Sequence, residues 1–449
     1  MSRPPRFSED GRQLVHIAMG SVALLLRYVS AWEGIVLAGA AVAFNLFALP
    51  RIAAGLYRPA ESRLRFFSGI VLYPATLLLL LVLLPDRRDI VAAAWGILAA
   101  GDGMATLVGH RVRSARIPWN REKSVAGTVA FALFGGAAGS ALCWWCRGTV
   151  IPPAYPWFTI WMPLVAAVAA AAVETIPIRL DDNISVPATA AAVMWWGSLI
   201  SEDLAARVAS AATGQLPLAV AANVAVAAAG YFGRTVTMPG AICGALIGIT
   251  IVLTAGWGGW ILLLATFAIA VLASRLGLKK KTMMGIAEER GGRRGAGNAF
   301  ANTGVAAVAA VLAALSYARD AALIGFVAAL VAGGSDTVAS EVGKAWGRRT
   351  WLVPTFRHVP PGTPGAISSE GTVAGLLAAL ALAAVGVGCS LVPASLIPAI
   401  VAAATLGAFA ESAMGATLEG RGIVNNDVLN FLNTAIAAAA AIFMAKGFE

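Results

Sequence analysis

Long apolar runs, separated by short polar loops, dominate the chain. Five of these runs approach the ~20 apolar residues that an α-helix needs to cross a bilayer. They lie at 66–84, 90–108, 239–254, 258–273 and 372–388. Counting runs of this kind along the 449 residues predicts about 15 membrane spans. The pattern therefore predicts an all-α, polytopic integral membrane protein.

Composition agrees with this prediction and gives the net charge a meaning. The chain is 59% hydrophobic and only 12% charged, which is about half the charge of a soluble domain. Its net charge of +10 comes from Lys and Arg gathered in a few loops, within 51–65, 111–123, 275–294 and 344–357. The positive-inside rule places these loops in the cytoplasm. We therefore expect a protein of a bacterial cytoplasmic membrane with active sites that face the cytoplasm, and no nucleic-acid partner.

A polar motif occurs twice at constant spacing. In GDGMATLVG (101–109) an aspartate is followed by a hydroxyl residue four positions later and a glycine seven positions later. SDTVASEVG (335–343) repeats these steps 336 − 102 = 234 residues further on. Because this offset is about half of the chain, the repeat indicates a duplicated domain. We expect two homologous halves in parallel orientation, residues 1–232 and 233–449.

The aspartate and the hydroxyl of each motif share one helix face, because they are one turn apart. An ionised carboxylate at mid-span costs roughly 2.5–3.5 kcal/mol, so a cation is expected beside it. Mg²⁺ takes hard oxygen ligands together with substrate phosphates. A polar helix contact or a helix cap is the alternative for one such motif. The candidate metal ligands from the two motifs are Asp102 and Thr106, and Asp336 and Ser340.

Basic residues and a helix start follow the first motif. Arg121 and Lys123 precede Ser124, and Gly127 and Thr128 come next. Helix N-terminal N–H groups and cations together form an anion site, although positive-inside anchoring alone explains any single cation. We therefore expect these residues to bind the phosphates of a nucleotide. The second half offers Ser368, Gly371 and Thr372, but Ile367 replaces the lysine, so positive charge must come from Arg357, Lys344 or Arg348.

Each half also has a carboxylate that leaves an apolar run and precedes an Asp/Asn cluster. Glu174 and Glu411 are these carboxylates. Clustered oxygen ligands near cations fit a metal–nucleotide site, or a base that accepts a hydroxyl proton; a solvated turn is the plainer explanation of the clusters alone. The expected catalytic residues are Asp102, Lys123, Glu174, Asp336 and Glu411, and the clusters add the candidate metal ligands Asp182, Asn183, Asn426 and Asp427.

Polar residues stand at the first membrane entry of each half as well. Arg12 and His16 are one helical turn apart, and Arg294, Asn298 and Asn302 follow the same spacing in the second half. We predict that these five residues contact the substrate. A purely interfacial position is the alternative for His16.

These motifs carry a resemblance to two enzyme families. RQLVHIAMG (12–20), AAWGILAAGDGMATLVG (93–109) and PWNREKSVAGT (118–128) resemble the phytol kinase / dolichol kinase family. GGRRGAGNAFANTG (291–304), GGSDTVASEVGK (333–344) and PPGTPGAISSEGTVAG (360–375) resemble the phytyl-phosphate kinase family. The resemblance implies a fusion of two membrane kinases that use CTP and Mg²⁺. It implies conversion of a prenyl alcohol, of the phytol or geranylgeraniol type, to its monophosphate and then to the diphosphate. It also implies a metal-ligand role for Glu341, which occurs only in the second pattern.

Two other functions fit parts of the pattern. A lipid transporter or flippase would also contain parallel repeats with charges in its spans, but the charges would lie near mid-span rather than toward one face. A membrane cytidylyltransferase would use similar metal ligands and release pyrophosphate instead of CDP. The three functions therefore differ in the depth of the carboxylates and in the products.

Overall fold

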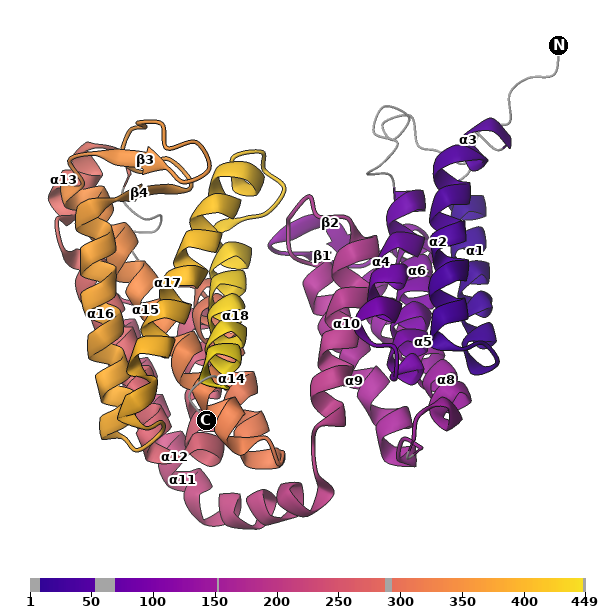
Figure 1. Cartoon of the computed structure of the whole chain (residues 1–449), viewed down its shortest axis with the longest axis horizontal. Helices are drawn as coiled ribbons and strands as arrows, with labels where there is room; N and C mark the ends of the chain where they lie inside the picture. Colours follow the sequence, from indigo (N-terminus) through magenta and orange to yellow (C-terminus); the bar gives the residue numbers. More distant parts are fainter. Residues whose placement is uncertain (1–8, 53–68, 152, 287–292, 447–449) are drawn as a thin grey trace. The chain divides into compact units, whose positions relative to one another are not determined.

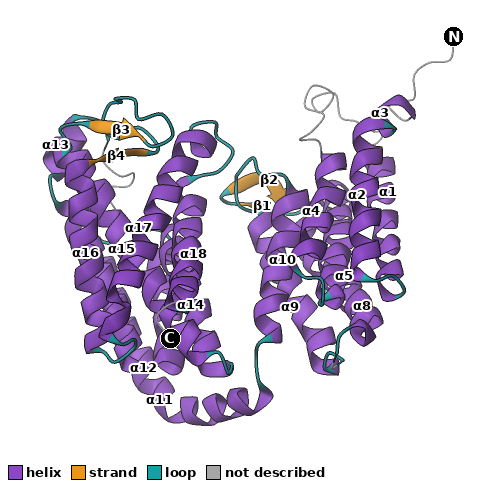
Figure 2. Cartoon of the chain, in the orientation of Figure 1, coloured by secondary structure: helices purple, strands orange, loops and turns teal. Residues whose placement is uncertain are grey.

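The computed structural model describes residues 9–52, 69–151, 153–286 and 293–446 (Figure 1). Helices make up most of these ranges, and the strands within them form two short two-stranded sheets (Figure 2). Among the described residues, ten helices are long and apolar enough to cross a membrane, and three apolar segments are shorter. The all-α membrane fold is therefore confirmed, while the number of about 15 spans stays a prediction.

Contacts within the chain divide it into two compact units, Met1–Ser198 and Leu199–Glu449. We call them unit 1 and unit 2 and describe each by itself. The boundary lies earlier than the one expected between residues 232 and 233. The reason is helix α11 (Glu202–Phe232), which packs against α12 (Met238–Arg275) and α14 (Ala296–Leu315) and so belongs to unit 2.

Unit 1 consists of helical segments and one hairpin. Its helices are α1 (Glu9–Met19), η1 (Gly20–Arg27), α2 (Ala31–Phe47), α3 (Leu49–Ile52), α4 (Gly69–Leu83), α5 (Arg88–Gly96), η5 (Ile97–Asp102), α6 (Gly103–Arg111), α7 (Val125–Ala130), η6 (Phe131–Gly135), α8 (Gly136–Cys146), η7 (Arg147–Thr149), α9 (Pro156–Glu174) and α10 (Asp182–Ser198). Between α6 and α7, strands β1 (Arg116–Ile117) and β2 (Asn120–Ser124) pair antiparallel.

Unit 2 repeats this composition. Besides α11, α12 and α14 it contains α13 (Leu278–Met283), α15 (Arg319–Trp346), α16 (Ser369–Gly388), η9 (Ala394–Leu396), α17 (Ile397–Met414), η10 (Gly415–Glu419) and α18 (Asn426–Ala445). Between α15 and α16, strands β3 (Thr350–Leu352) and β4 (Ala366–Ser368) pair antiparallel. In both units a hairpin thus joins an aspartate-bearing helix to the next helix.

Helix α12 folds back on itself. Its backbone leaves the helical region at Gly256, where φ is 71° and ψ is −173°. The N–H of Thr237, just before the helix, donates to the carbonyl of Arg294 at 3.0 Å. The Arg294 side chain in turn donates to Ser274 Oγ, near the other end of α12, at 3.5 Å. A straight helix between these positions would be roughly 55 Å long, so the two segments on either side of Gly256 must run antiparallel.

The helix that carries the aspartate is the most enclosed span of each unit. Of the spanning window in Arg88–Arg111, 72% is buried, and of that in Arg319–Trp346, 78%; none of the other eight described spans exceeds 44%. Side chains with no exposed surface, such as Ile90, Leu98, Phe326 and Leu330, surround these helices with the apolar core. Each aspartate is therefore held on the least mobile support that its unit offers.

Candidate functional site

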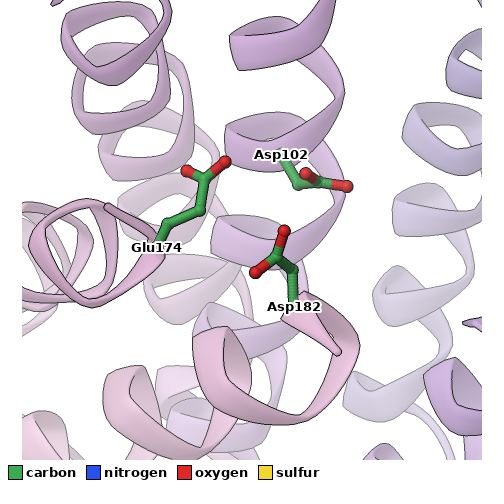
Figure 3. Close-up of side chains that lie close together, drawn as sticks. All are labelled: Asp102, Glu174 and Asp182. Atoms are coloured by element: carbon green, nitrogen blue, oxygen red, sulfur yellow. The ribbon is translucent and has the colours of Figure 1, made fainter. Parts of the chain in front are cut away.

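Three acidic side chains of unit 1 converge from separate elements. Asp102 ends η5, Glu174 ends α9, and Asp182 begins α10. One carboxylate oxygen from each lies within 4.8 Å of the other two, and Figure 3 shows the three side chains close together on three separate segments. We call this group the acidic cluster. Like charges at this separation repel in a medium of low dielectric, so the cluster requires positive charge beside it.

Lys123 supplies such a charge. Its Nζ lies 2.5 Å from Glu174 Oε1 and 3.2 Å from Asp182 Oδ2. Burial by itself lowers the pKa of Lys123, but the neighbouring carboxylates of Glu174 and Asp182 outweigh it, and the pKa is raised above its ordinary value. Lys123 is therefore an ammonium ion inside the acidic cluster. One positive charge against three carboxylates still leaves an excess of negative charge.

The first helix reaches the same place. His16 Nε2, from α1, lies 3.6 Å from Asp102 Oδ2 and 3.4 Å from the carbonyl oxygen of Leu98. The imidazole also contacts Tyr73 edge to face, with ring centroids 4.8 Å apart. The Tyr73 hydroxyl accepts a hydrogen bond from Trp95 Nε1 at 2.7 Å. The structure thus brings His16 to the acidic cluster, whereas the side chain of Arg12 lies outside the described residues.

A π turn positions Asp102. The run Ile97–Asp102 is a π turn between α5 and α6, and Phe131–Gly135 is a second one in the neighbouring helix. The two turns pack closely, because a Cβ on Gly135 would lie 3.1 Å from the Cα of Gly101. Such turns occur often at functional sites. The sequence pattern did not reveal either turn.

The helix start predicted beside the cluster exists. Ser124 caps α7 by accepting a hydrogen bond from the Gly127 N–H at 3.2 Å, and Thr128 Oγ1 donates to the Ser124 carbonyl at 3.1 Å. Gly127 lets α7 approach α6, since a Cβ there would lie 2.9 Å from the carbonyl oxygen of Ala105. Arg121, by contrast, is exposed on strand β2.

Two predicted metal ligands of unit 1 differ in their surroundings. Thr106 is half-buried on α6, one turn after Asp102. Asn183 instead donates to Asp181 Oδ1 through its backbone and its side chain, at 2.9 and 2.7 Å. Its amide lies against Gly69, at the start of α4. Asn183 therefore stabilises the turn before α10 through its N–H groups, and its role as a metal ligand stays a prediction.

Unit 2 contains a cavity of about 370 Å³, which we call the polar cavity. Many predicted site residues line it: Arg294, Asn298, Asn302, Asp336, Ser340, Ser368, Gly371, Thr372, Glu411 and Asn426. Three further groups on its wall were not predicted as site residues. They are the carboxylate of Glu419 in η10, the amide of Asn430 in α18, and the loop Thr363–Gly365, whose Gly365 has φ 75°.

Three predicted residues of unit 2 are absent from the described wall of the polar cavity. Glu341 is 2% exposed and bound between Lys281 and Lys344, the latter at 3.0 Å. Arg357 is exposed on the β3–β4 hairpin. Asp427 lies against Gly297, in the first turn of α14. Arg357 lies away from the cavity on the hairpin, and Glu341 and Asp427 each lie one residue after a residue of the cavity wall. Sequence spacing alone did not reveal these positions.

The helix starts of the two units share their geometry. In unit 2, Ser368 caps α16 by accepting from the Gly371 N–H at 3.1 Å, and Thr372 Oγ1 donates to the Ser368 carbonyl at 2.9 Å. Gly371 packs against α15, where a Cβ would lie 3.3 Å from the Cα of Gly343. In unit 1 the Cα of Gly109 is likewise the glycine neighbour of Gly127. The same serine–glycine–threonine arrangement therefore stands beside an aspartate helix in each unit.

Comparison with known proteins shows the family. The sequence profile of the family described as "Integral membrane protein DUF92" matches residues 221–438. An uncharacterised membrane protein of Synechocystis sp. is 40% identical over 202 residues, which cover 44% of this chain and 78% of that protein. The chain belongs to the DUF92 integral membrane protein family. Every residue on the described wall of the polar cavity, from Arg294 to Asn430, falls within the DUF92 match.

Two relatives of this DUF92 protein have names that state an activity. The probable phytol kinase 3, chloroplastic, of Glycine max is 32% identical over 203 residues, and the farnesol kinase, chloroplastic, of Arabidopsis thaliana is 28% identical over 195 residues. These matches cover 42% and 40% of this chain and 62% of each relative. The chain thus spans less than two thirds of either kinase. No solved structure matches it.

Proposed function

We propose that this protein is a membrane-bound prenyl alcohol kinase that uses CTP and Mg²⁺. In this proposal unit 1 phosphorylates the alcohol, unit 2 phosphorylates the monophosphate, and the two units descend from one duplicated domain. The observation that carries the proposal is the acidic cluster. Its Asp102 lies on the most enclosed span of unit 1, and the cluster contacts Lys123, which directly precedes the capped start of α7. The names of the two kinase relatives support the substrate class.

The donor set fits Mg²⁺. The acidic cluster offers three hard oxygen ligands within 4.8 Å of one another, and its charge exceeds what Lys123 neutralises. Asp102 and Asp182 would hold the ion in unit 1, with Thr106 on the same helix face as Asp102. In unit 2, Asp336 and Asn426 line the polar cavity together with Glu411. A bound Mg²⁺ would neutralise charge on the nucleotide phosphates.

The chain's own residues would provide positioning and proton transfer. Phosphoryl transfer depends mainly on alignment and electrostatic stabilisation. The N–H groups at the start of α7, together with the Lys123 ammonium, favour phosphate binding. The hydroxyl oxygen of the alcohol attacks the γ-phosphorus, the bond to the β-phosphate oxygen breaks, and CDP leaves. Glu174 accepts the hydroxyl proton. In unit 2, Glu411 would accept the proton of a monoanionic prenyl phosphate, and the start of α16 with Lys344 would hold the nucleotide.

Both carboxylates lie slightly toward the end of their span that leads into a basic loop. Asp102 lies nine residues before the end of α6, and Asp336 lies ten residues before the end of α15. At 1.5 Å per residue they are roughly 4 and 5 Å from the midpoints of Arg88–Arg111 and Arg319–Trp346. Transporter sites also lie near the bilayer midplane, so the reaction products, rather than depth, distinguish a kinase from a transporter.

A product assay tests the proposal. Protein in detergent is incubated with labelled CTP, Mg²⁺ and a panel of prenyl alcohols, and the lipid and nucleotide products are separated. We expect a prenyl monophosphate, a diphosphate and CDP; release of pyrophosphate would identify a cytidylyltransferase instead. Asp102→Asn should abolish use of the alcohol, and Asp336→Asn should let the monophosphate accumulate. Equal loss of both products from either variant would indicate one composite site.

Matched controls exist on the same helical segments or beside them. Asp86→Asn precedes α5, and Asp320→Asn lies in the first turn of α15; both aspartates are exposed. These two variants remove the same charge outside the proposed sites, so they should leave both steps unchanged. Loss of activity in them would mean that any loss of charge in these segments damages the protein.

A further inference from the structure

A second cavity of unit 2 adjoins the polar cavity. It has a volume of about 110 Å³ and lies between α11, both segments of α12, and α14. We call it the apolar cavity, because its wall is formed largely by side chains such as Val226, Ala227, Leu263 and Phe267. Arg294, Asn298 and Asn302 line both cavities. A molecule with a polar head and an apolar tail could therefore place one end in each.

An indole bounds the apolar cavity at depth. Trp260 Nε1 donates to Asn223 Oδ1 at 3.0 Å, and Asn223 Nδ2 donates to the Ala219 carbonyl at 2.8 Å. Asn223 is only 4% exposed, so these bonds fix the indole. Trp260 lies 15 residues before Arg275, or roughly 22 Å along the helix from the end that meets Arg294. Arg294 and the Trp260 indole thus lie at opposite ends of the apolar cavity.

The apolar cavity has an opening on an outer face of α12. Gly244 lines it and is exposed at the same time, and a Cβ on Gly244 would meet no atom within 4 Å. Its neighbours Ile242 and Leu246 are 55% and 62% exposed. Exposed aliphatic side chains on a membrane span face lipid. Gly244 therefore stands at a passage from the cavity to the bilayer.

We propose that the apolar cavity binds the tail of a prenyl phosphate, whose head occupies the polar cavity and whose distal part leaves to the bilayer past Gly244. This inference rests on the proposed function and names the place of the lipid within it. Asn298 Oδ1 is buried and has no hydrogen-bond partner among the described residues, so the head region offers an acceptor for a protonated phosphate oxygen. The small volume, below the ~300 Å³ of typical ligand sites, fits only the first part of a tail.

Photolabelling tests the inference directly. The probe is a geranylgeranyl monophosphate analogue with a photoreactive group in its first isoprene units, and labelled peptides are identified by mass spectrometry. We expect labels in α11, α12 and α14 on residues of the apolar cavity. Gly244→Leu should reduce labelling about tenfold, because the new side chain fills the passage. Gly214→Leu is the matched control: it lies on α11 of the same unit, is exposed, has free space for a Cβ, and is not on the cavity wall.

The outcomes separate this inference from the proposed function. Labels confined to other surfaces, with phosphorylation intact, overturn the inference and leave the kinase proposal standing. Labels in the apolar cavity of a protein that phosphorylates no prenyl substrate support the inference and overturn the kinase proposal. If Gly244→Leu fails to fold in a thermal melt, the labelled positions in the unchanged protein decide. In a chain-length series, Gly244→Leu should also slow geranylgeranyl phosphate more than dimethylallyl phosphate; equal slowing would overturn the passage.

Discussion

In unit 1 the lysine that meets the carboxylates comes from the hairpin. Lys123 directly precedes the cap Ser124 and binds Glu174 and Asp182. In unit 2 the residue before the cap Ser368 is Ile367, and the lysine on the cavity wall is Lys344, from the aspartate helix itself. The caps and the glycine contacts agree in both units. The backbone frame is thus shared, while the element that delivers positive charge differs.

The two units also differ in the charged groups that hold this lysine in place. Lys344 binds Glu341, and Glu341 also binds Lys281, which is 1% exposed. In unit 2 an internal ion-pair chain therefore fixes the lysine, whereas in unit 1 the carboxylates of the acidic cluster fix Lys123 directly. Lys344 lies on the helix and not on the hairpin, and Glu341, itself paired with Lys281, holds it in position. We expect each half of this comparison to respond to different substitutions.

The largest effect is expected at Lys281. Lys281→Met leaves a buried carboxylate with one cation fewer, and loss of one partner of a buried ion pair costs about 3–5 kcal/mol. The free energy of unfolding in detergent should fall by about 3 kcal/mol, the lower end, because Lys344 remains bound to Glu341. Lys279→Met, at an exposed lysine two positions earlier, is the control. Equal stability of the two variants would contradict a supporting role for the ion-pair chain.

Lys123→Ile makes unit 1 resemble unit 2 at the hairpin. Removing a fixed cation from a phosphoryl-transfer site slows the step about 100-fold, or about 2.7 kcal/mol. Formation of monophosphate from the alcohol should fall by this factor, whereas formation of diphosphate from added monophosphate should not change. Arg121→Ile removes an exposed cation of the same strand and should change little. A matching fall in the second step would show that the units do not work separately.

The glycine contacts predict a smaller loss of stability. A Cβ on Gly371 would lie 2.5 Å from the Ala339 carbonyl oxygen, and one on Gly127 would lie 2.9 Å from the Ala105 carbonyl oxygen. Gly371→Val should therefore lower the free energy of unfolding by about 2 kcal/mol, and Gly127→Val by less. Gly388→Val, at the end of the same helix with open space around it, is the control. A larger loss of unfolding free energy in Gly127→Val than in Gly371→Val would contradict this prediction.

The smallest effect is expected from Asn426→Asp, which adds a fourth carboxylate to Asp336, Glu411 and Glu419 on the wall of the polar cavity. Ligand charge raises affinity for hard divalent cations. The Mg²⁺ concentration for half-maximal diphosphate formation should fall about fivefold, or about 1 kcal/mol. Asn425→Asp, at the cap of α18, controls for charge outside the cavity. An unchanged Mg²⁺ dependence would remove Asn426 from the proposed ligand set.

Sequence reasoning predicted the features that depend on short-range spacing. Apolar run length predicted the membrane class, and each copy of the repeated motif lies on a helical span that precedes a hairpin. It also predicted a helix start beside Arg121 and Lys123, where Ser124 caps α7; the capping roles of Ser124 and Ser368 come from the structure. These predictions share one basis: each depends on side chains that are neighbours along the chain.

Features set by tertiary packing were not predictable in the same way. The boundary between the two units lies before α11 because α11 packs against α12 and α14, and apolar composition does not predict this packing. Glu341 and Asp427 have suitable chemistry, yet each faces a partner other than the polar cavity. The π turn at Ile97–Asp102 shifts the helix register, and no sequence pattern specific to π turns marks it. Contacts between residues far apart in the sequence therefore determine which candidate metal ligands lie close together.

The π turn at Ile97–Asp102 also determines how the amino-terminal helix docks. A π turn shifts the backbone hydrogen-bond ladder by one residue, and the Leu98 carbonyl within it is the group that His16 approaches. Attachment of α1 thus depends on main-chain geometry as much as on the carboxylate of Asp102. A deletion that restored regular winding there would move the Leu98 carbonyl relative to His16 and rotate Asp102 relative to Glu174 and Asp182, with no change in the acidic side chains themselves.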